Sequence, residues 1–454
     1  MHDRPLTPHL PARSPGRRKR TGQSRLMGLL LRYLSVSRVS TRVGMSCAMM
    51  VWASTLCWPA PVLAQATGSP VSPSAGVAGT DEPRETESPR LLRRTQPRWD
   101  LLLMKTSTGD QSVTSIEQWE VRRAGIVQAM QAVMGDLPGD ERRCPLDVSV
   151  DEVELIADIA RLHLTYQSEA GGFVPAYLFV LVSSLDELPF EMELTDEQRE
   201  RTRDSAASRQ GDATRRPAML CLHPTDQVRG NRGVIGIPER PTMGYALELA
   251  RRGYVTLAPA YPLLADYQPD LAALGWESGS MKAIWDNVRG LDLLTSLPCV
   301  DPDRMGAIGH SLGGHNAVYT AVLEPRIKVV VTSCGLDAYV DYYDGREDVW
   351  RPGAGWCQER YIPRLAQYAD DLESIPYDFP ELIGALAPRR VLIVAPVGDD
   401  NFRAASVDRI ATSARQVYRL WERESSLEVL HPPGPHDFSD DMRKAAYEWI
   451  DESW

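Results

Sequence analysis

The sequence predicts an α/β protein with a mainly parallel sheet of about eight strands, helices on both faces and an antiparallel hairpin at one edge. Two observations lead to this prediction. From residue 217 on, runs rich in Val, Ile and Leu alternate with helix-like segments, and a glycine-linked pair of alternating runs precedes them. Continuous apolar strands are typical of a sheet buried on both faces. Alternation with helices makes neighbouring strands parallel through right-handed crossovers.

The strands and helices follow one another along the second half of the chain. Strand-like runs occupy residues 218–223, 254–260, 305–310, 327–334, 390–397 and 427–431, and helix-like segments occupy 241–252, 281–297, 312–323, 404–421 and 439–452. The hairpin comes earlier, where "ARLHLTYQSE" and "GFVPAYLFVLV" are joined by Ala170, Gly171 and Gly172. A further helix is predicted over 115–135, where apolar residues recur at helical spacing and Gly135 ends the pattern.

The N-terminal part of the chain has a different character. Residues 1–66 are interpreted as an extension with a signal peptide, because 43–66 is uncharged, apolar and ends in small residues near Ala64 and Ala66. The alternative is a retained membrane anchor, since about 20 uncharged residues can span a bilayer. Residues 67–97 are rich in Pro, Ser, Thr, Gly and Glu, which predicts a disordered linker.

A single domain is predicted over 98–454, with a helical extension at 98–159. Residues 191–215 are almost wholly polar and are interpreted as an exposed insertion, with disorder as one form that it could take. A formal net charge of −11 argues against nucleic acid as a partner, because phosphate binding needs a basic surface. The oligomeric state is left open.

Cysteines and histidines give little indication of a metal or redox centre. Removal of the signal would leave an odd number of cysteines, so at least one thiol is free, and one disulfide stays open as an alternative. No Cys-x-x-Cys pair occurs in the sequence. His431 and His436 stand near aspartates, but no third ligand follows at a usable spacing. We therefore expect no metal and no cofactor.

The chemistry of the chain is concentrated in "RMGAIGHSLGGHNAVY", residues 304–319. An apolar strand runs into Gly-x-Ser-x-Gly and a helix-like segment follows. Gly309 and Gly313 leave room for a strained turn that would lift Ser311 above the edge of the sheet. A serine needs a base, a group that orients the base, and donors for the oxyanion. The N–H of Leu312, at the start of the helix, is a predicted oxyanion donor.

This segment resembles the nucleophile elbow of the α/β-hydrolase superfamily. "SGSMKAIWDNVRGLDLL" (278–294) and "ERYIPRLAQY" (359–368) resemble a group of secreted serine esterases related to dienelactone hydrolases and acetyl xylan esterases. The likeness covers roughly 115–454. It implies an α/β-hydrolase fold in which the catalytic acid and then the histidine follow the serine, each after a later strand.

The implied acid and histidine lie where that order places them. "VLIVAPVGDDNF" ends in Asp399 and Asp400; by likeness to serine peptidases that use the first aspartate of such a run, Asp399 is assigned, with Asp400 as the alternative. His436 follows a Pro/Gly-rich loop and precedes Asp-Phe, as in related esterases, whereas His431 lies in an apolar run. We therefore assign His436 as the base.

The resemblance also implies a second oxyanion donor and a lid. Relatives carry His-Gly-x after the first buried strand, and this chain has His223-Pro224-Thr225. Proline has no N–H, so Thr225 becomes the candidate donor. Residues 336–385 are interpreted as a lid-like insertion. Four of its residues are candidate substrate contacts, with packing of the aromatic ones against the core as the alternative: Trp350, Trp356, Tyr361 and Arg364.

These assignments predict an exported serine esterase that acts through an acyl-enzyme on a small-molecule or carbohydrate ester, without stable membrane association unless the signal is retained. Two alternatives remain. One is a serine peptidase of the prolyl-oligopeptidase type, although the residues before 216 show no propeller repeat. The other is an inactive hydrolase-like binding protein, which would be expected to lack a member of the triad.

Overall fold

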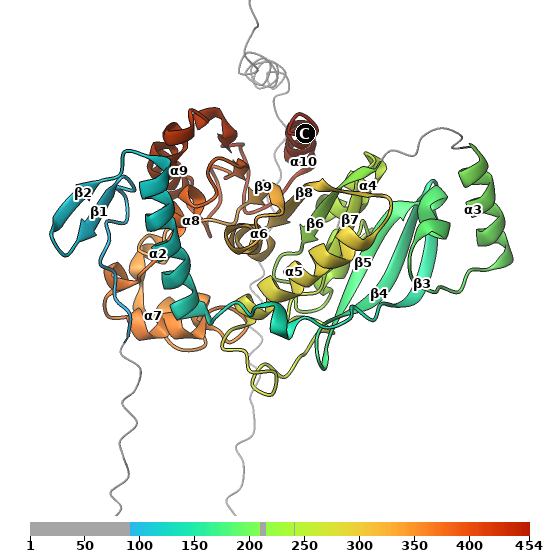
Figure 1. Ribbon diagram of the computed structural model, residues 1–454, viewed down its shortest axis with the longest axis horizontal. Helices are drawn as coiled ribbons and strands as arrows, with labels where there is room; N and C mark the ends of the chain where they lie inside the picture. The colour runs from blue at the N-terminus through green and yellow to red at the C-terminus, as the bar shows by residue number, and fades with distance from the viewer. Residues whose placement is uncertain (1–90, 209–214, 240) are drawn as a thin grey trace, which may run out of the picture. The chain divides into compact units, whose positions relative to one another are not determined.

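The computed structural model describes residues 91–208, 215–239 and 241–454 (Figure 1). The predicted signal segment 43–66 and most of the predicted linker lie outside these residues. Among the described helices, none is both long and apolar enough to span a bilayer.

A nine-stranded sheet forms the centre of the described chain, in the order β11-β10-β9-β8-β6-β7-β5-β4-β3. Its strands are β3 (Ser149–Ile156), β4 (Ile159–Glu169), β5 (Gly172–Leu181), β6 (Arg216–Leu222), β7 (Val255–Pro259), β8 (Val300–His310), β9 (Ile327–Ser333), β10 (Arg390–Val394) and β11 (Leu427–Leu430). Strands β6 to β11 pair in parallel, while β3, β4 and β5 form an antiparallel group whose last strand pairs with β7. The predicted fold class is confirmed, with β3 as one strand more than the sequence indicates.

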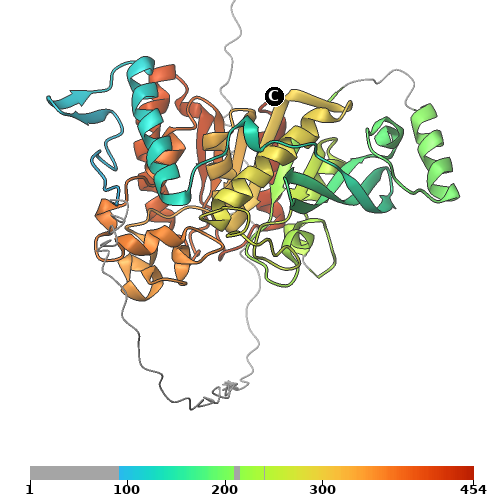
Figure 2. The same cartoon turned by 60° about the horizontal axis from the view of Figure 1, so that its bottom comes forward.

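Helices cover both faces of the sheet (Figure 2). They are α2 (Ile116–Met134), α3 (Asp196–Ser208), α4 (Tyr245–Arg251), α5 (Gly279–Ser296), α6 (Leu312–Leu323), α7 (Glu347–Trp350), α8 (Phe379–Gly384), α9 (Ala404–Tyr418) and α10 (Asp440–Asp451). One apolar cluster joins α4 and α10 to one face of β8 and β9. The larger cluster joins α2, α5, α6, α8 and α9 to the other face. Residues alternate between these clusters along the central strands, as a sheet buried on both sides requires.

The region before β4 contains more strand than predicted. The expected helical extension 98–159 has its helix in α2, but β1 (Leu103–Thr106) and β2 (Gly109–Ser112) form a separate two-stranded sheet, and β3 pairs with β4. Strand β3 was not predicted because "SVDEVELI" contains three charged residues among eight and none of its residues is buried. An edge strand with one solvated face carries this composition, which also discourages pairing with other chains.

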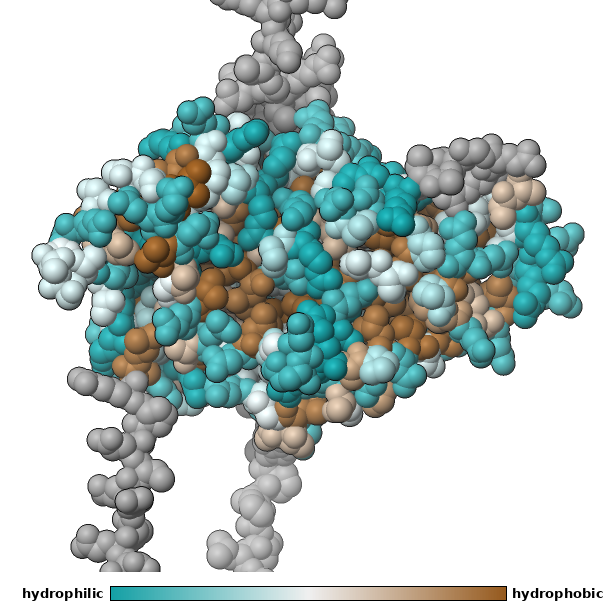
Figure 3. Space-filling model, in the orientation of Figure 1, coloured by the Kyte–Doolittle hydropathy of each residue, from teal (hydrophilic) through white to brown (hydrophobic). Residues whose placement is uncertain are grey.

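The polar insertion 191–215 is partly ordered. Helix α3 occupies Asp196–Ser208, so disorder does not hold for these residues, and Thr202 is its one buried residue. The surface of this helix is strongly hydrophilic (Figure 3). Because only one of its thirteen residues is buried, the helix presents a narrow face to the domain.

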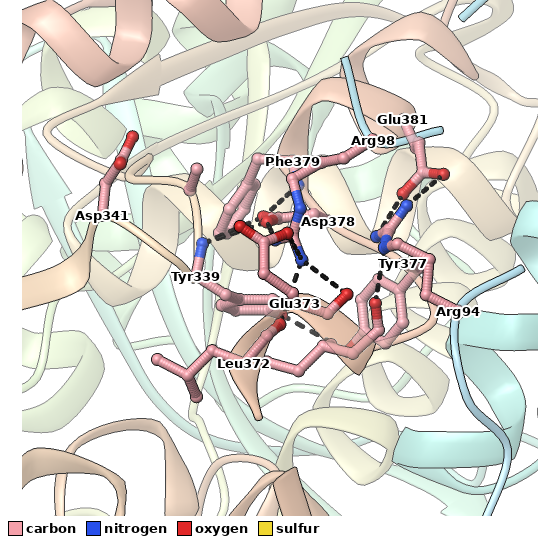
Figure 4. Close-up of polar contacts among 12 residues, drawn as sticks. Arg94, Arg98, Tyr339, Asp341, Leu372, Glu373, Tyr377, Asp378, Phe379 and Glu381 are labelled. Atoms are coloured by element: carbon pink, nitrogen blue, oxygen red, sulfur yellow. Dashed lines mark hydrogen bonds and ion pairs between the residues drawn. The ribbon is translucent and has the colours of Figure 1, made fainter. Parts of the chain in front are cut away.

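The described end of the predicted linker is docked on the lid rather than free. Arg94 N–H donates to Ser374 O at 2.8 Å, and the Arg94 side chain pairs with Glu381 (Figure 4). The Arg98 guanidinium pairs with Asp378, whose carboxylate also accepts from the Tyr339 N–H at 3.1 Å. These contacts correct the linker prediction for residues 91–97. They hold together the chain before α2 and the two ends of the lid-like segment 336–385.

Candidate active site

Ser311 lies between β8 and α6 in a backbone conformation that few side chains adopt. Its φ is 53° and its ψ is −120°, and its N–H donates to Ser333 O at 2.8 Å. The flanking glycines are required by space. A Cβ on Gly309 would lie 2.2 Å from Gly313 O, and one on Gly313 would lie 1.9 Å from Leu222 O. The turn is therefore a strained strand-to-helix junction of the kind that presents a nucleophile.

His436 bridges Ser311 and Asp399. Its Nε2 lies 2.9 Å from Ser311 Oγ, and its Nδ1 lies 3.0 and 2.9 Å from the two Asp399 oxygens. A carboxylate can only accept, so Nδ1 carries the proton and Nε2 is left to accept the serine proton. The three side chains come from the ends of β8, β10 and β11, which are separated widely in the sequence but meet at one edge of the sheet.

Asp399 is held as an anion. Burial opposes its ionisation, but hydrogen bonds from His436 and from the Phe402 and Asn401 N–H groups outweigh burial and lower the pKa of Asp399 below its usual range. Asp400, the alternative acid, is exposed, and His436 Nδ1 binds Asp399 instead.

His431, the alternative base, takes a structural position. Its Nδ1 lies 2.8 Å from Ala395 O and its Nε2 lies 2.9 Å from Asp408 Oδ1. His310, which precedes the serine, also has a structural contact: its Nδ1 lies 3.2 Å from Ser333 Oγ. The His310 ring packs 5.0 Å from that of His436, between centroids.

The loop after β6 approaches the elbow closely. Because Gly313 lies against Leu222 O, the first turn of α6 sits directly beside the end of β6, where His223 begins the loop. Tyr261 N–H donates to His223 Nε2 at 3.0 Å, so Nδ1 carries the proton that is donated to Pro224 O at 2.7 Å. Burial lowers the pKa of His223 to about 4, which keeps the ring neutral in this arrangement. Within the described chain, the N–H of Thr225 has no acceptor.

The four lid residues predicted as substrate contacts occupy different environments. Trp350 is completely buried, so its ring packs the lid against the core and does not line a cleft. Arg364 pairs with Glu277 at 2.7 Å and donates to Ala132 O, which ties it to the end of α2. Trp356 is 3% exposed, and its ring lies 4.6 Å from His315. Tyr361 is partly exposed and binds Thr225 through its hydroxyl.

Two residues near the site were not singled out by the sequence. Cys334 follows β9 with a φ of 48°, and its thiol pKa is raised by burial and by the neighbouring Asp399. His315, one turn after the serine, is buried against Trp356, and burial lowers its pKa to about 3. The position of Cys334 at a strand end is the only sequence signal for its proximity.

Cys334 also changes the assessment of metal binding. Its sulfur and one ligand atom each of Asp399 and His436 lie within 4.8 Å of one another, so the described residues contain a third potential ligand that spacing did not indicate. The raised pKa of the buried Cys334 thiol favours its protonated form, which is a poor metal ligand. Asp399 already accepts hydrogen bonds from His436 and from the Asn401 and Phe402 N–H groups. The expectation of a metal-free site stays a prediction.

Comparison with known proteins adds family information to this geometry. Residues 274–421 match the family described as glucuronyl esterase, fungi. YtaP of Bacillus subtilis (strain 168), named as a hydrolase, is 34% identical over 30% of this chain and 41% of its own length. The 4-O-methyl-glucuronoyl methylesterase 1 of Sodiomyces alcalophilus is 27% identical over 28% of this chain and 27% of its own. The matched regions thus span less than half of these curated relatives.

Solved structures agree on the fold. A glucuronoyl esterase from Solibacter usitatus aligns with a TM-score of 0.58 at 15% identity, covering 80% of this chain and 99% of its own. A glucuronoyl esterase from Teredinibacter turnerae T7901 aligns with a TM-score of 0.55 at 16% identity, covering 83% and 94%. The matched family and the Sodiomyces relative are both named as esterases. The elbow, the sheet order and these structural likenesses show that the described chain has an α/β-hydrolase fold.

Proposed function

We propose that the protein is a serine carboxylic ester hydrolase with Ser311, His436 and Asp399 as its catalytic triad. The observation that supports this most directly is the unbroken hydrogen-bond chain from Ser311 Oγ through His436 to Asp399. A buried, ionised aspartate holds the imidazole in the tautomer that can accept a proton, which is the arrangement a serine nucleophile needs.

Acylation follows from the positions of these groups. Ser311 Oγ attacks the carbonyl carbon of the ester while its proton passes to His436 Nε2, and Asp399 stabilises the resulting imidazolium. In this proposal the oxyanion accepts hydrogen bonds from the N–H groups of Leu312, at the start of α6, and Thr225, on the loop after β6. His436 then gives its proton to the leaving alcohol, and the acyl group stays on Ser311.

Deacylation reverses the roles. Water enters where the alcohol left, His436 Nε2 takes one of its protons, and the hydroxide attacks the acyl carbon. Collapse of the second tetrahedral intermediate returns the proton to Ser311 Oγ and releases the carboxylic acid. Each step uses groups of the chain and water.

For the substrate, we propose the ester of a carbohydrate. The matched family and the Sodiomyces methylesterase are both named for esters of glucuronic acid. We also propose that the protein is exported, on the basis of the apolar segment 43–66. Cell fractionation with an antibody against the catalytic domain tests export: retention of the whole population in the cytosol would contradict it.

The function is tested with p-nitrophenyl esters from acetate to octanoate and with the methyl ester of glucuronic acid. We expect hydrolysis by the wild type, no hydrolysis by Ser311→Ala, and full activity of Ser413→Ala, a buried serine on α9 that serves as control. Labelling of Ser311 by an organophosphonate is expected in the same preparations. Equal rates for wild type and Ser311→Ala, or cleavage of dipeptide anilides without cleavage of any ester, would overturn the proposal.

A further inference from the structure

The lid reaches the predicted oxyanion loop through one pair of hydroxyl groups. The Tyr361 hydroxyl lies 2.8 Å from Thr225 Oγ1, across 136 positions of the sequence. Thr225 carries the only loop N–H assigned to the oxyanion, because the preceding Pro224 has none. The orientation of this single residue therefore matters more here than in a loop with two donors.

Tyr361 is fixed by its own backbone. The first turn of α5 donates to the lid backbone, from Gly279 N–H to Glu359 O at 2.9 Å and from Ser280 N–H to Tyr361 O at 3.1 Å. A Cβ on Gly279 would lie 2.4 Å from Arg360 O, so this close approach requires glycine. The backbone of Tyr361 is therefore held firmly against α5, although the surrounding segment has little regular structure.

The ring of Tyr361 also contacts the other side of the elbow. It packs against a small apolar cluster that contains Leu312, Tyr261 and Leu264. Its centroid lies 6.5 Å from that of Tyr261, the residue whose N–H holds His223 at the start of the oxyanion loop. The ring therefore touches the group that includes Leu312, while the hydroxyl binds Thr225.

We infer that Tyr361 is a positioning residue for the oxyanion site: its hydroxyl fixes Thr225, and thereby couples the docked lid to the stabilisation of the transition state. This inference rests on the proposed esterase function. An exposed threonine in a loop would otherwise sample several orientations, and a small displacement of an oxyanion donor lowers the rate of reaction more than it weakens substrate binding.

The test measures kcat and KM for a short p-nitrophenyl ester in the full chain. Tyr361→Phe removes the hydroxyl and keeps the ring, Thr225→Val removes its partner, and Thr225→Ser keeps a hydroxyl. Tyr368→Phe is the matched control, because this lid tyrosine donates to Leu92 O and not to the site. We expect kcat to fall about tenfold in Tyr361→Phe and in Thr225→Val, with KM changed less than about twofold.

Coupling between the two hydroxyls distinguishes positioning from independent effects. The double variant should be no slower than the slower single variant, Thr225→Ser should keep most of the activity, and thermal unfolding should be unchanged in Tyr361→Phe. An unchanged kcat in Tyr361→Phe, or losses that multiply in the double variant, would overturn the inference while leaving the esterase intact. Absence of Ser311-dependent hydrolysis in the wild type would remove the proposed function itself, and this inference with it.

Discussion

Arg94 and Glu381 form a two-pronged ion pair although 287 positions separate them. Arg94 Nη1 and Nη2 donate to the two Glu381 oxygens at 2.9 and 2.8 Å, and only 8% and 1% of the two side chains are exposed. Burial raises the pKa of Glu381, which the Arg94 charge opposes. The chain that precedes α2 is thus attached to α8 by a buried ion pair. Each charge of the pair would be unfavourable in this buried position without the other.

Removing one member of this pair should destabilise the domain strongly. Arg94→Met leaves the Glu381 carboxylate buried without its partner, which we expect to lower the free energy of unfolding by about 3–5 kcal/mol. The double variant Arg94→Met/Glu381→Leu should recover much of this loss. Urea denaturation provides the measurement.

Arg93→Met is the matched control for that experiment. Its partner Asp371 and Arg93 itself are 51% and 58% exposed, so the pair contributes less than about 1 kcal/mol. Equal losses in the Arg93 and Arg94 variants would show that the buried pair has no special role.

The sequence predicts the sheet and the reaction residues from different signals. Buried strands such as β8 and β10 need continuous apolar runs, which local composition reveals. The Gly-x-Ser-x-Gly pattern after β8 singles out Ser311, whereas the choice of Asp399 over Asp400 after β10 came from the resemblance to serine peptidases. Strand β3 was missed because its apolar residues are only partly buried at the edge of the sheet, and helix α3 was left open because only one of its residues is buried.

Contacts made by docking could not be predicted. The Tyr361–Thr225 pair and the burial of Trp350 depend on how the irregular lid packs against α5 and the core. Neither leaves a periodic signal, because each residue is placed by tertiary contacts and not by a repeating backbone geometry. The proximity of Cys334 to Asp399 is of the same kind.

The two adjacent aspartates provide a sharp test of the triad. Asp399→Asn should lower kcat for ester hydrolysis by about 10³–10⁴-fold, because an amide no longer holds the His436 tautomer that accepts the serine proton. Asp400→Asn should retain activity within about twofold, since that side chain is exposed. Because the pKa of Asp399 is lowered, its carboxylate stays ionised even when the pH falls to 3.8, the usual pKa of an aspartate. Greater loss in the Asp400 variant would transfer the role of acid to Asp400.

Asp337 should make the stability of the lid depend on pH. Burial raises the pKa of Asp337 from 3.8 to about 7. The Arg403 charge acts to lower this pKa and the Asp341 charge acts to raise it. A folded-state pKa above the unfolded value favours the protonated form, so the stabilisation is complete below about pH 4 and is lost as the pH rises to about 7. The unfolding free energy of the wild type, relative to Asp337→Asn, should fall across that window. Parallel curves for the two proteins would contradict the assignment.

Gly313 should be the least replaceable glycine of the elbow. An alanine Cβ at this position would lie 1.9 Å from Leu222 O, so α6 must move away from the end of β6. We expect Gly313→Ala to cost at least about 1–3 kcal/mol of stability and to lower kcat, because Leu312 and Thr225 would then separate. Gly125→Ala on α2 is the control: no heavy atom lies within 4 Å of its Cβ position, and alanine should stabilise that helix by about 0.5–1 kcal/mol. Thermal unfolding and ester hydrolysis of both variants check this, and an active, stable Gly313→Ala protein would mean that the contact between α6 and β6 is not needed for the elbow.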